Sequence, residues 1–298
     1  MIKRVIPIAL LGITVLSACH NGGSGDFKNS NGIEYKIVKD APGDAHPKVG
    51  DFASVNIKMY AGDSLLADSR VLNQGKPVEL QVQESKMRGD WMGALTMLTA
   101  GDSAIFRVKV DSLKKYLGGQ PLPPFMKSGT YLTYQVSLVS VKTAADYKKE
   151  QDSKAVQQKD ADDKTLQEYF AKNNIKANKT ASGLYYTIQS EGNGTQIKAG
   201  DTAYVNYTGK TMDGKVFDSN TDPAIAHGRP MKPLEIPVGA HAMIPGMDEG
   251  ISLLKKGSKA TLYLPSGLAY GAASPGPGIG PNSILIFDVE VKDVKSAK

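Results

Sequence analysis

The chain has 298 residues, enough for two domains of ordinary size. Its residues are 41% hydrophobic and 22% charged, and beyond the N-terminus no apolar run reaches the roughly 18 residues of a spanning helix, which argues against an integral helical membrane protein. The formal net charge of +6 comes without a basic stripe or a nucleic-acid motif, so the composition also argues against a nucleic-acid-binding protein.

The N-terminal segment has the residue order of a secretory leader. Lys3 and Arg4 precede a short apolar stretch at 5–15, and small residues then lead to Cys19. Residues 16–19, Leu-Ser-Ala-Cys, resemble the bacterial lipobox. The resemblance implies cleavage before Cys19 and attachment of lipid to that cysteine, and a leader cleaved without lipidation is the alternative.

Lipidation would account for the one cysteine of the chain, since a single cysteine forms no intramolecular disulfide. Two or more acyl chains hold a protein firmly at a membrane. We therefore expect a signal peptide at 1–18 and a flexible tether at 19–32. The expected location is the cell envelope, on its periplasmic or external face. His20 and Asn21 include no acidic residue after the cysteine, which by analogy favours the outer membrane.

An internal repeat relates the two halves of the chain. An offset of 150 residues aligns Val55-Asn56 with Val205-Asn206 and Asp68-Ser69 with Asp218-Ser219. With small shifts the match extends to residues 77–80 and 233–236, and then to Gly101 and Gly257. We infer two copies of one fold, at 33–142 and 177–298.

The segment between the copies, residues 143–176, is rich in charged residues, glutamine and alanine, and it contains neither proline nor glycine. This composition favours an exposed helical linker. Leu166, Tyr169, Phe170 and Ile175 include helical spacings that would let its last turns pack on a domain. A dimerising coiled coil is a poorly supported alternative because sustained apolar heptads are missing, and the oligomeric state stays undetermined.

The C-terminal copy reads as short antiparallel strands and one helix. Residues 203–207, 260–264 and 284–289 alternate as half-buried strands do, and Asp213-Gly214 is typical of a tight hairpin turn. A helix is expected at 245–256, because Pro245 suits its first turn and Gly257 can close it. The expected fold class is α+β, with two domains that are each a curled antiparallel sheet wrapped on a short helix.

Five motifs of the C-terminal copy, in order, resemble the signature of the FK506-binding proteins (FKBPs), which are peptidyl-prolyl cis/trans isomerases. They are VNYTG at 205–209, DGKVFDS at 213–219, IPGMDEG at 244–250, AYG at 269–271 and ILIFDVE at 284–290. The resemblance covers roughly residues 180–294. It implies an isomerase with its pocket in this copy.

Isomerisation requires rotation about an X-Pro amide, whose barrier of about 18–20 kcal/mol comes from resonance. The reaction needs no nucleophile, metal or cofactor, and the four scattered histidines lack the spacing of a metal site. A dry apolar pocket favours the twisted amide. By resemblance, the catalytic residues are Tyr207, Phe217, Asp218, Tyr270 and Phe287, and the substrate-binding residues are Leu234, Met243, Ile244, Met247 and Ile279.

The expected partners are proline-containing unfolded or nascent polypeptides that have been exported. Macrolide inhibitors are further candidate ligands by resemblance. Met247 stands where the family commonly has a tryptophan, Leu234 replaces a frequent phenylalanine, and the loop at 221–232 is longer than in minimal members. The alternative function is a non-catalytic chaperone that holds peptides in the same pocket.

The N-terminal copy retains less of this pattern. The repeat places Ile57 at the position of Tyr207, Ala67 at that of Phe217 and Asp68 at that of Asp218, while Trp91 falls on Met247 and Tyr134 on Phe287. We expect a degenerate domain that binds clients or mediates contacts and isomerises weakly or not at all.

Overall fold

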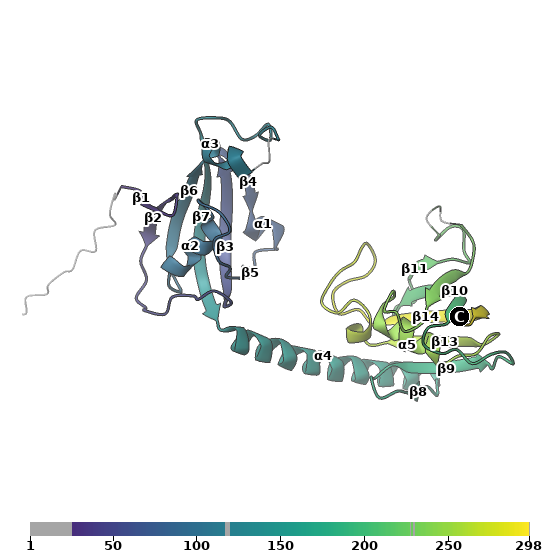
Figure 1. The fold of residues 1–298 in the computed structure, drawn as a ribbon. Coiled ribbons are helices and arrows are strands. Elements are labelled where there is room, and N and C mark those ends of the chain that lie inside the picture. Colours follow the sequence, from purple (N-terminus) through teal and green to yellow (C-terminus); the bar gives the residue numbers. More distant parts are fainter. Residues whose placement is uncertain (1–25, 117–119, 227, 229, 298) are drawn as a thin grey trace, which may run out of the picture. The chain divides into compact units, whose positions relative to one another are not determined.

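The structure is a computed structural model that describes residues 26–116, 120–226, 228 and 230–297 (Figure 1). The chain divides into two compact units, Met1–Lys148 and Lys149–Lys298. Cys19, with the expected signal peptide, lies outside the described residues. Within the described part of the chain, no helix combines the length and the apolar character needed to cross a membrane.

The first unit is an antiparallel sheet with short helices. Its strands run in the order β1-β2-β6-β7-β3-β4, and β5 also pairs with β3. The strands are β1 (Lys28–Ser30), β2 (Ile33–Lys39), β3 (Phe52–Ala61), β4 (Ser64–Asp68), β5 (Val78–Gln81), β6 (Ser103–Lys109) and β7 (Tyr131–Lys142). The helices are α1 (Ser69–Leu72), α2 (Trp91–Ala94) and α3 (Val110–Leu113), with 3-10 turns at Leu95–Met97 and Lys114–Tyr116.

The second unit repeats this arrangement. Its strands run in the order β11-β10-β14-β13-β9-β8, and β12 also pairs with β10. The strands are β8 (Asn178–Lys179), β9 (Tyr185–Ser190), β10 (Thr202–Thr211), β11 (Val216–Ser219), β12 (Leu234–Pro237), β13 (Lys259–Leu264) and β14 (Leu285–Lys295). The helices are α4 (Ala144–Asn173), which begins in the first unit, and α5 (Pro245–Ser252), with a 3-10 turn at Ser266–Leu268.

The two strand orders are the same when each strand of the first sheet is matched in chain order to one of the second. In both sheets every strand pair is antiparallel, and the long third strand lies beside the last one. The repeat found in the sequence is therefore a repeat of topology, and the α+β fold class with two similar domains is confirmed.

The expected range of the tether, residues 19–32, overlaps the first domain of the structure. Residues Lys28–Ser30 form β1, which pairs with β2 through a turn at Asn31 and Gly32. Both turn residues have positive φ values, +47° and +80°. An Asn-Gly pair adopts this conformation readily and matches the twist of a hairpin. The first domain therefore begins before residue 33.

The helix expected at 245–256 ends earlier, at Ser252. Pro245 opens α5 as expected, because its fixed φ suits the first turn. Leu254 and Lys255 already belong to a turn that leads into β13, and Gly257 has a φ of +90° in that turn. Gly257 therefore starts the strand connection and does not close the helix.

Two layers cover the sheet of the second unit. On its inner face, the buried side chains of α5, Met247 and Ile251, belong to the main core with Leu262 and Leu264 of β13. Outer-face residues of the same sheet pack against the end of α4 in a second cluster. That cluster contains Leu166, Phe170, Tyr185, Tyr263, Ile284 and Ile286, with Tyr169 and Ile175 packed against it. The expected docking of the last turns of α4 is confirmed.

Candidate functional site

Most of the expected site residues lie in one cluster on the inner face of the second sheet. The members come from β10, β11, β12, β14, α5 and the loops before α5 and β14, so the curled sheet brings together positions up to 80 residues apart. Buried members are Tyr207, Met247, Ile279 and Phe287, and partly buried members are Phe217, Leu234, Met243 and Ile244.

Three aromatic rings of this cluster pack on one another, one pair edge to face and the other tilted. Phe217 and Phe287 have centroids 5.8 Å apart and an interplanar angle of 86°, and Tyr207 and Phe287 have centroids 6.3 Å apart at 52°. Such pairs contribute about 0.5–1.5 kcal/mol beyond the burial of their area. The three rings form an apolar wall that is held in a defined geometry.

Gly209 gives the rings their space. It lies opposite Phe287 on β14 and opposite Asp218 on β11. A Cβ atom at this position would lie 2.7 Å from Cζ of Phe217 and 2.8 Å from Cε1 of Phe287, closer than real Cβ contacts. Glycine is thus the residue at position 209 that lets both rings approach the strand.

Asp218 supplies the carboxylate of the cluster. Its Oδ2 accepts a hydrogen bond of 2.8 Å from the hydroxyl of Tyr207. The strand is fixed beside this pair because the side chain of Asn220 accepts a bond of 2.8 Å from the backbone N–H of Tyr207. A half-buried carboxylate is thus hydrogen-bonded to one of the three aromatic residues of the wall.

The structure places Tyr270 apart from the buried cluster. Its side chain is 39% exposed. Leu268 and Ala269, immediately before it, pack against the core cluster that also contains the rings. Ile244 directly precedes α5, and its carbonyl accepts the first bonds of the helix, from the N–H groups of Met247 and Asp248.

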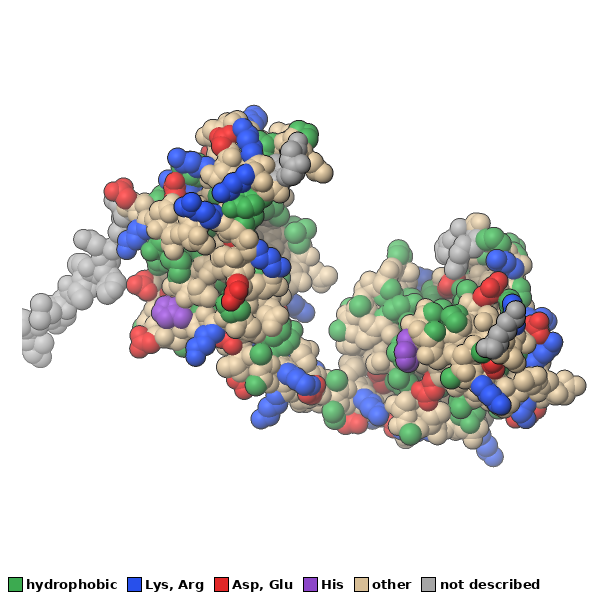
Figure 2. Space-filling model, in the orientation of Figure 1, with side chains coloured by type: hydrophobic (Ala, Val, Ile, Leu, Met, Phe, Trp, Pro, Cys, Tyr) green, Lys and Arg blue, Asp and Glu red, His purple; other side chains and the backbone are tan. Residues whose placement is uncertain are grey.

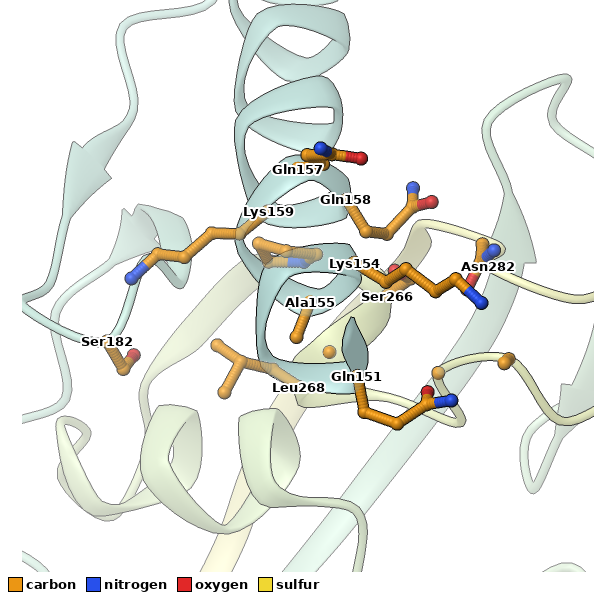
Figure 3. A pocket seen from close by; sticks show the side chains of 14 residues that line it. Gln151, Lys154, Ala155, Gln157, Gln158, Lys159, Ser182, Ser266, Leu268 and Asn282 are labelled. Carbon is orange, nitrogen blue, oxygen red and sulfur yellow. The ribbon is translucent and has the colours of Figure 1, made fainter. Parts of the chain in front are cut away.

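A groove of about 660 Å³ lies between α4 and the segment 265–272, which includes the loop that carries Tyr270 (Figure 3). Gln151, Ala155 and Gln158 line it from α4, and Ser266 and Leu268 line it from the loop. The linker helix thus forms one wall of this groove, and the loop that carries Tyr270 forms the other.

The surface of both units carries both signs of charge. On the face shown in Figure 2, Lys and Arg side chains are interspersed with Asp and Glu over both units. Among the described residues, no group of three or more His, Cys, Asp or Glu side chains is close enough together to hold a metal ion.

The first domain differs from the second at the equivalent positions. Lys58 pairs with Asp68 and Met59 with Ala67, whereas Thr208 pairs with Ser219 and Gly209 with Asp218. Position 68 therefore matches position 219, and the sequence alignment of Asp68 with Asp218 is wrong by one residue.

The side chain of Asp68 also points away from the core. It accepts a bond of 2.9 Å from the N–H of Arg70 at the start of α1 and lies 3.5 Å from Nζ of Lys58. Ser69 Oγ takes the role of Asn220, accepting the N–H of Ile57 at 2.9 Å. The offset error arises because the hairpin that joins β3 to β4 is one residue shorter than the hairpin that joins β10 to β11.

Other bulky side chains stand in the first domain where the second domain has its aromatic wall. Trp91 stacks on Tyr134 with ring centroids 5.3 Å apart, and Met59 stands at the position of Gly209. Burial, followed by the charge of Asp90, raises the pKa of Tyr134 to about 12. This domain lacks the carboxylate, the glycine and the ring triad of the second one.

Two features of the site were missed by reasoning from the sequence. Gly209 could have been found, since it closes the VNYTG motif between two strand positions, where glycine marks a close approach. Asp162 of α4, which contacts the loop of Tyr270, offers no signal because it is one of many acidic residues in a charged segment.

Comparison with known proteins identifies the second domain. Residues 193–292 match the family model of the FKBP-type peptidyl-prolyl cis-trans isomerases. The chain is 42% identical over 151 residues to the probable FKBP-type peptidyl-prolyl cis-trans isomerase FkpA of Neisseria meningitidis, which covers 48% of this chain and 51% of that protein. It is 40% identical over 116 residues to the outer membrane protein MIP of Legionella longbeachae, covering 39% and 46%.

Among solved structures, FkpA from Escherichia coli is 40% identical in sequence, with 52% of this chain and 66% of that chain covered and a TM-score of 0.39. The chain spans between 51% and 60% of the length of the first curated relatives that it matches.

Proposed function

We propose that the second domain, which belongs to the family of FKBP-type peptidyl-prolyl cis-trans isomerases, catalyses rotation about X-Pro bonds. One observation carries the proposal: the Asp218–Tyr207 pair and the ring triad lie together on the inner face of the sheet, within the segment that matches the family. A module that only holds peptides would not need this placement of polar groups beside the rings.

The geometry supports catalysis without covalent chemistry. A planar X-Pro amide is stabilised by resonance, and a twisted amide has lost that charge separation. The apolar wall formed by Tyr207, Phe217 and Phe287 therefore favours the twisted state over the planar one. Lowering the barrier by about 5.5 kcal/mol gives a ten-thousandfold acceleration.

Polar groups at the edge of the wall would hold the substrate while the bond rotates. In the proposed site, the Tyr270 hydroxyl and the backbone N–H of Ile244 donate to substrate carbonyl groups, and Asp218 accepts from Tyr207 and faces the rotating amide. The remaining proposed contacts with the proline ring are apolar. They come from Leu234, Met243, Met247 and Ile279. Met247 is 1% exposed and forms the buried base of the cluster.

The experiment that tests this proposal follows cis/trans exchange of a short X-Pro peptide by NMR. We expect the purified chain to accelerate exchange far beyond the uncatalysed lifetime of tens of seconds. Asp218→Asn should lower kcat/KM about tenfold, because hydrogen bonds to a charged partner contribute about 1.5–3 kcal/mol.

Asp68→Asn is the matched control, since it makes the same change in the hairpin of the first domain, at a carboxylate that caps α1. It should leave kcat/KM within about twofold, because Asp68 faces away from the core and asparagine also caps a helix well. If the folded wild-type chain does not accelerate exchange, the isomerase proposal fails and a peptide-holding chaperone becomes the better account. Suppression of aggregation of an unfolded protein would then test that account. Equal losses of kcat/KM in the two variants would contradict the assignment of Asp218 to the catalytic site.

We further infer that the first domain binds client chains or mediates contacts without contributing catalysis. It shares the fold of the second, but Met59, Ala67 and Leu66 stand at the positions of Gly209, Asp218 and Phe217. The clients that fit the proposed activity are proline-containing polypeptides that have been exported. In this view the residual activity of the Asp218→Asn chain comes from the second domain alone, and it should disappear when Gly209→Ala is added.

Lipidation of Cys19 would place the chain at the membrane of the cell envelope. The leader, the lipobox-like residues 16–19 and the similarity to an outer membrane protein support this location, and His20 and Asn21 favour the outer membrane. We expect Cys19→Ala to abolish incorporation of an alkyne-labelled fatty acid in cells and to release the protein from the membrane fraction. Cys19→Ala protein that still carries the label would contradict the anchor.

A further inference from the structure

A buried carboxylate on α4 is bonded to the loop that carries Tyr270. Asp162 is 3% exposed, and Ser266 is fully buried. Oδ2 of Asp162 accepts a bond of 2.7 Å from the backbone N–H of Ser266 and one of 2.6 Å from its hydroxyl. Oδ1 accepts a bond of 2.7 Å from the side-chain amide of Gln158, one turn earlier on the helix. Both carboxylate oxygens are therefore engaged.

Ser266 transmits this attachment to the residues on either side of Tyr270. Its carbonyl oxygen accepts bonds from the N–H groups of Ala269 at 3.0 Å and Gly271 at 2.9 Å. The carbonyl of Gly271 in turn accepts the N–H of Asn282 at 2.7 Å. A continuous set of hydrogen bonds thus joins α4 to the backbone that directs the tyrosine side chain.

We propose that Asp162 is a positioning residue of the isomerase site, which fixes the 266–271 loop and through it the hydroxyl of Tyr270. The inference rests on the proposed function, in which that hydroxyl binds a substrate carbonyl. Tyr270 needs such support because its own side chain is 39% exposed and little else holds its direction by burial. In this proposal the linker helix helps to position a substrate-binding group of the catalytic domain.

The neighbouring residue shows how this role differs from docking the helix. Asp163 accepts bonds of 2.8 Å from the hydroxyl of Tyr185 and from the side chain of Gln167, and it pairs with Lys179. The hydrogen bond from Lys179 holds the pKa of Asp163 below its ordinary value. These contacts attach α4 to β8 and β9 and not to the loop. We therefore expect Asp163→Ala to weaken the packing of α4 on the sheet without releasing the loop that carries Tyr270.

The test measures isomerase kinetics of the full chain with Asp162→Ala and Asp163→Ala, each alone and combined with Tyr270→Phe. We expect Asp162→Ala to lower kcat/KM about fivefold in the wild-type background and less than twofold with Tyr270→Phe, since residues that act through one contact are not additive. Asp163→Ala should change it less than twofold in either background. Equal effects of Asp162→Ala with and without the tyrosine hydroxyl would overturn the proposal.

Amide hydrogen exchange provides a readout that does not depend on activity. Asp162→Ala should speed exchange at Ser266, Ala269 and Gly271 at least tenfold while β13 and β14 stay protected, and Asp163→Ala should not. Unchanged exchange in the loop would overturn the inference even if the chain is an isomerase. Faster exchange in a chain without isomerase activity would refute the proposed function alone.

If Asp162→Ala unfolds the second domain, Asp162→Asn serves instead, because its one remaining side-chain oxygen can accept from Ser266. The same three amides should then exchange faster, to a smaller degree, and unchanged exchange in this folded variant would overturn the proposal.

Discussion

Replacing Gly209 with alanine should lower kcat/KM for X-Pro isomerisation about a hundredfold while the second domain remains folded. The added Cβ would meet Phe217 at 2.7 Å and Phe287 at 2.8 Å, so both rings must move away from the strand. A misplacement of about 1 Å can lower an enzymatic rate a hundredfold. The measurement is peptide exchange by NMR, with circular dichroism and urea unfolding to establish that the variant is folded.

Lys210→Ala is the matched control on the same strand. Lys210 follows Gly209 and points to the outer face, where its Nζ lies 2.7 Å from Asp288. Removing this partly exposed ion pair should change stability by no more than about 1 kcal/mol and leave kcat/KM within about twofold. If Gly209→Ala keeps the activity of Lys210→Ala, the ring wall is not the part of the domain that acts on the amide.

The fold of the second domain could be predicted because its signals are local and ordered. Alternation along 203–207 and 260–264, the Asp213-Gly214 turn and Pro245 each specify a short element, and their order matches one family. The strand pairings then follow from the fold. Eight of the ten expected site residues lie in one cluster for this reason, and Asp218 joins them through Tyr207.

What the sequence did not predict depends on register and on long-range contacts. The mismatch of Asp68 with Asp218 arises because the hairpin of β3 and β4 is one residue shorter than the hairpin of β10 and β11, and a one-residue shift moves a side chain to the other face of the sheet. The charges of Lys255 and Lys256 favour a longer helix, but α5 ends at Ser252 because a turn follows it. Asp162 and Ser266 are 104 positions apart, so no local pattern connects them.

The last turns of α4 should be as important for stability as the core of the sheet itself. Phe170 packs edge to face on Tyr263, with centroids 4.9 Å apart, and on Tyr185, at 5.0 Å. It is 7% exposed. Phe170→Ala removes both ring contacts and leaves a cavity, so we expect the free energy of unfolding of the second unit to fall by about 3–5 kcal/mol.

Urea unfolding of the full chain, followed by circular dichroism and by fluorescence, checks this prediction. Trp91 is the one tryptophan of the chain and lies in the first unit, so its fluorescence should keep the same midpoint while the second transition moves to lower urea. Val156→Ala on the same helix, at a side chain that is 59% exposed, should shift neither transition by more than about 0.5 kcal/mol. Equal stability of the Phe170 and Val156 variants would mean that α4 only links the two domains, and a boundary at residue 177 would then enclose everything that the isomerase domain needs.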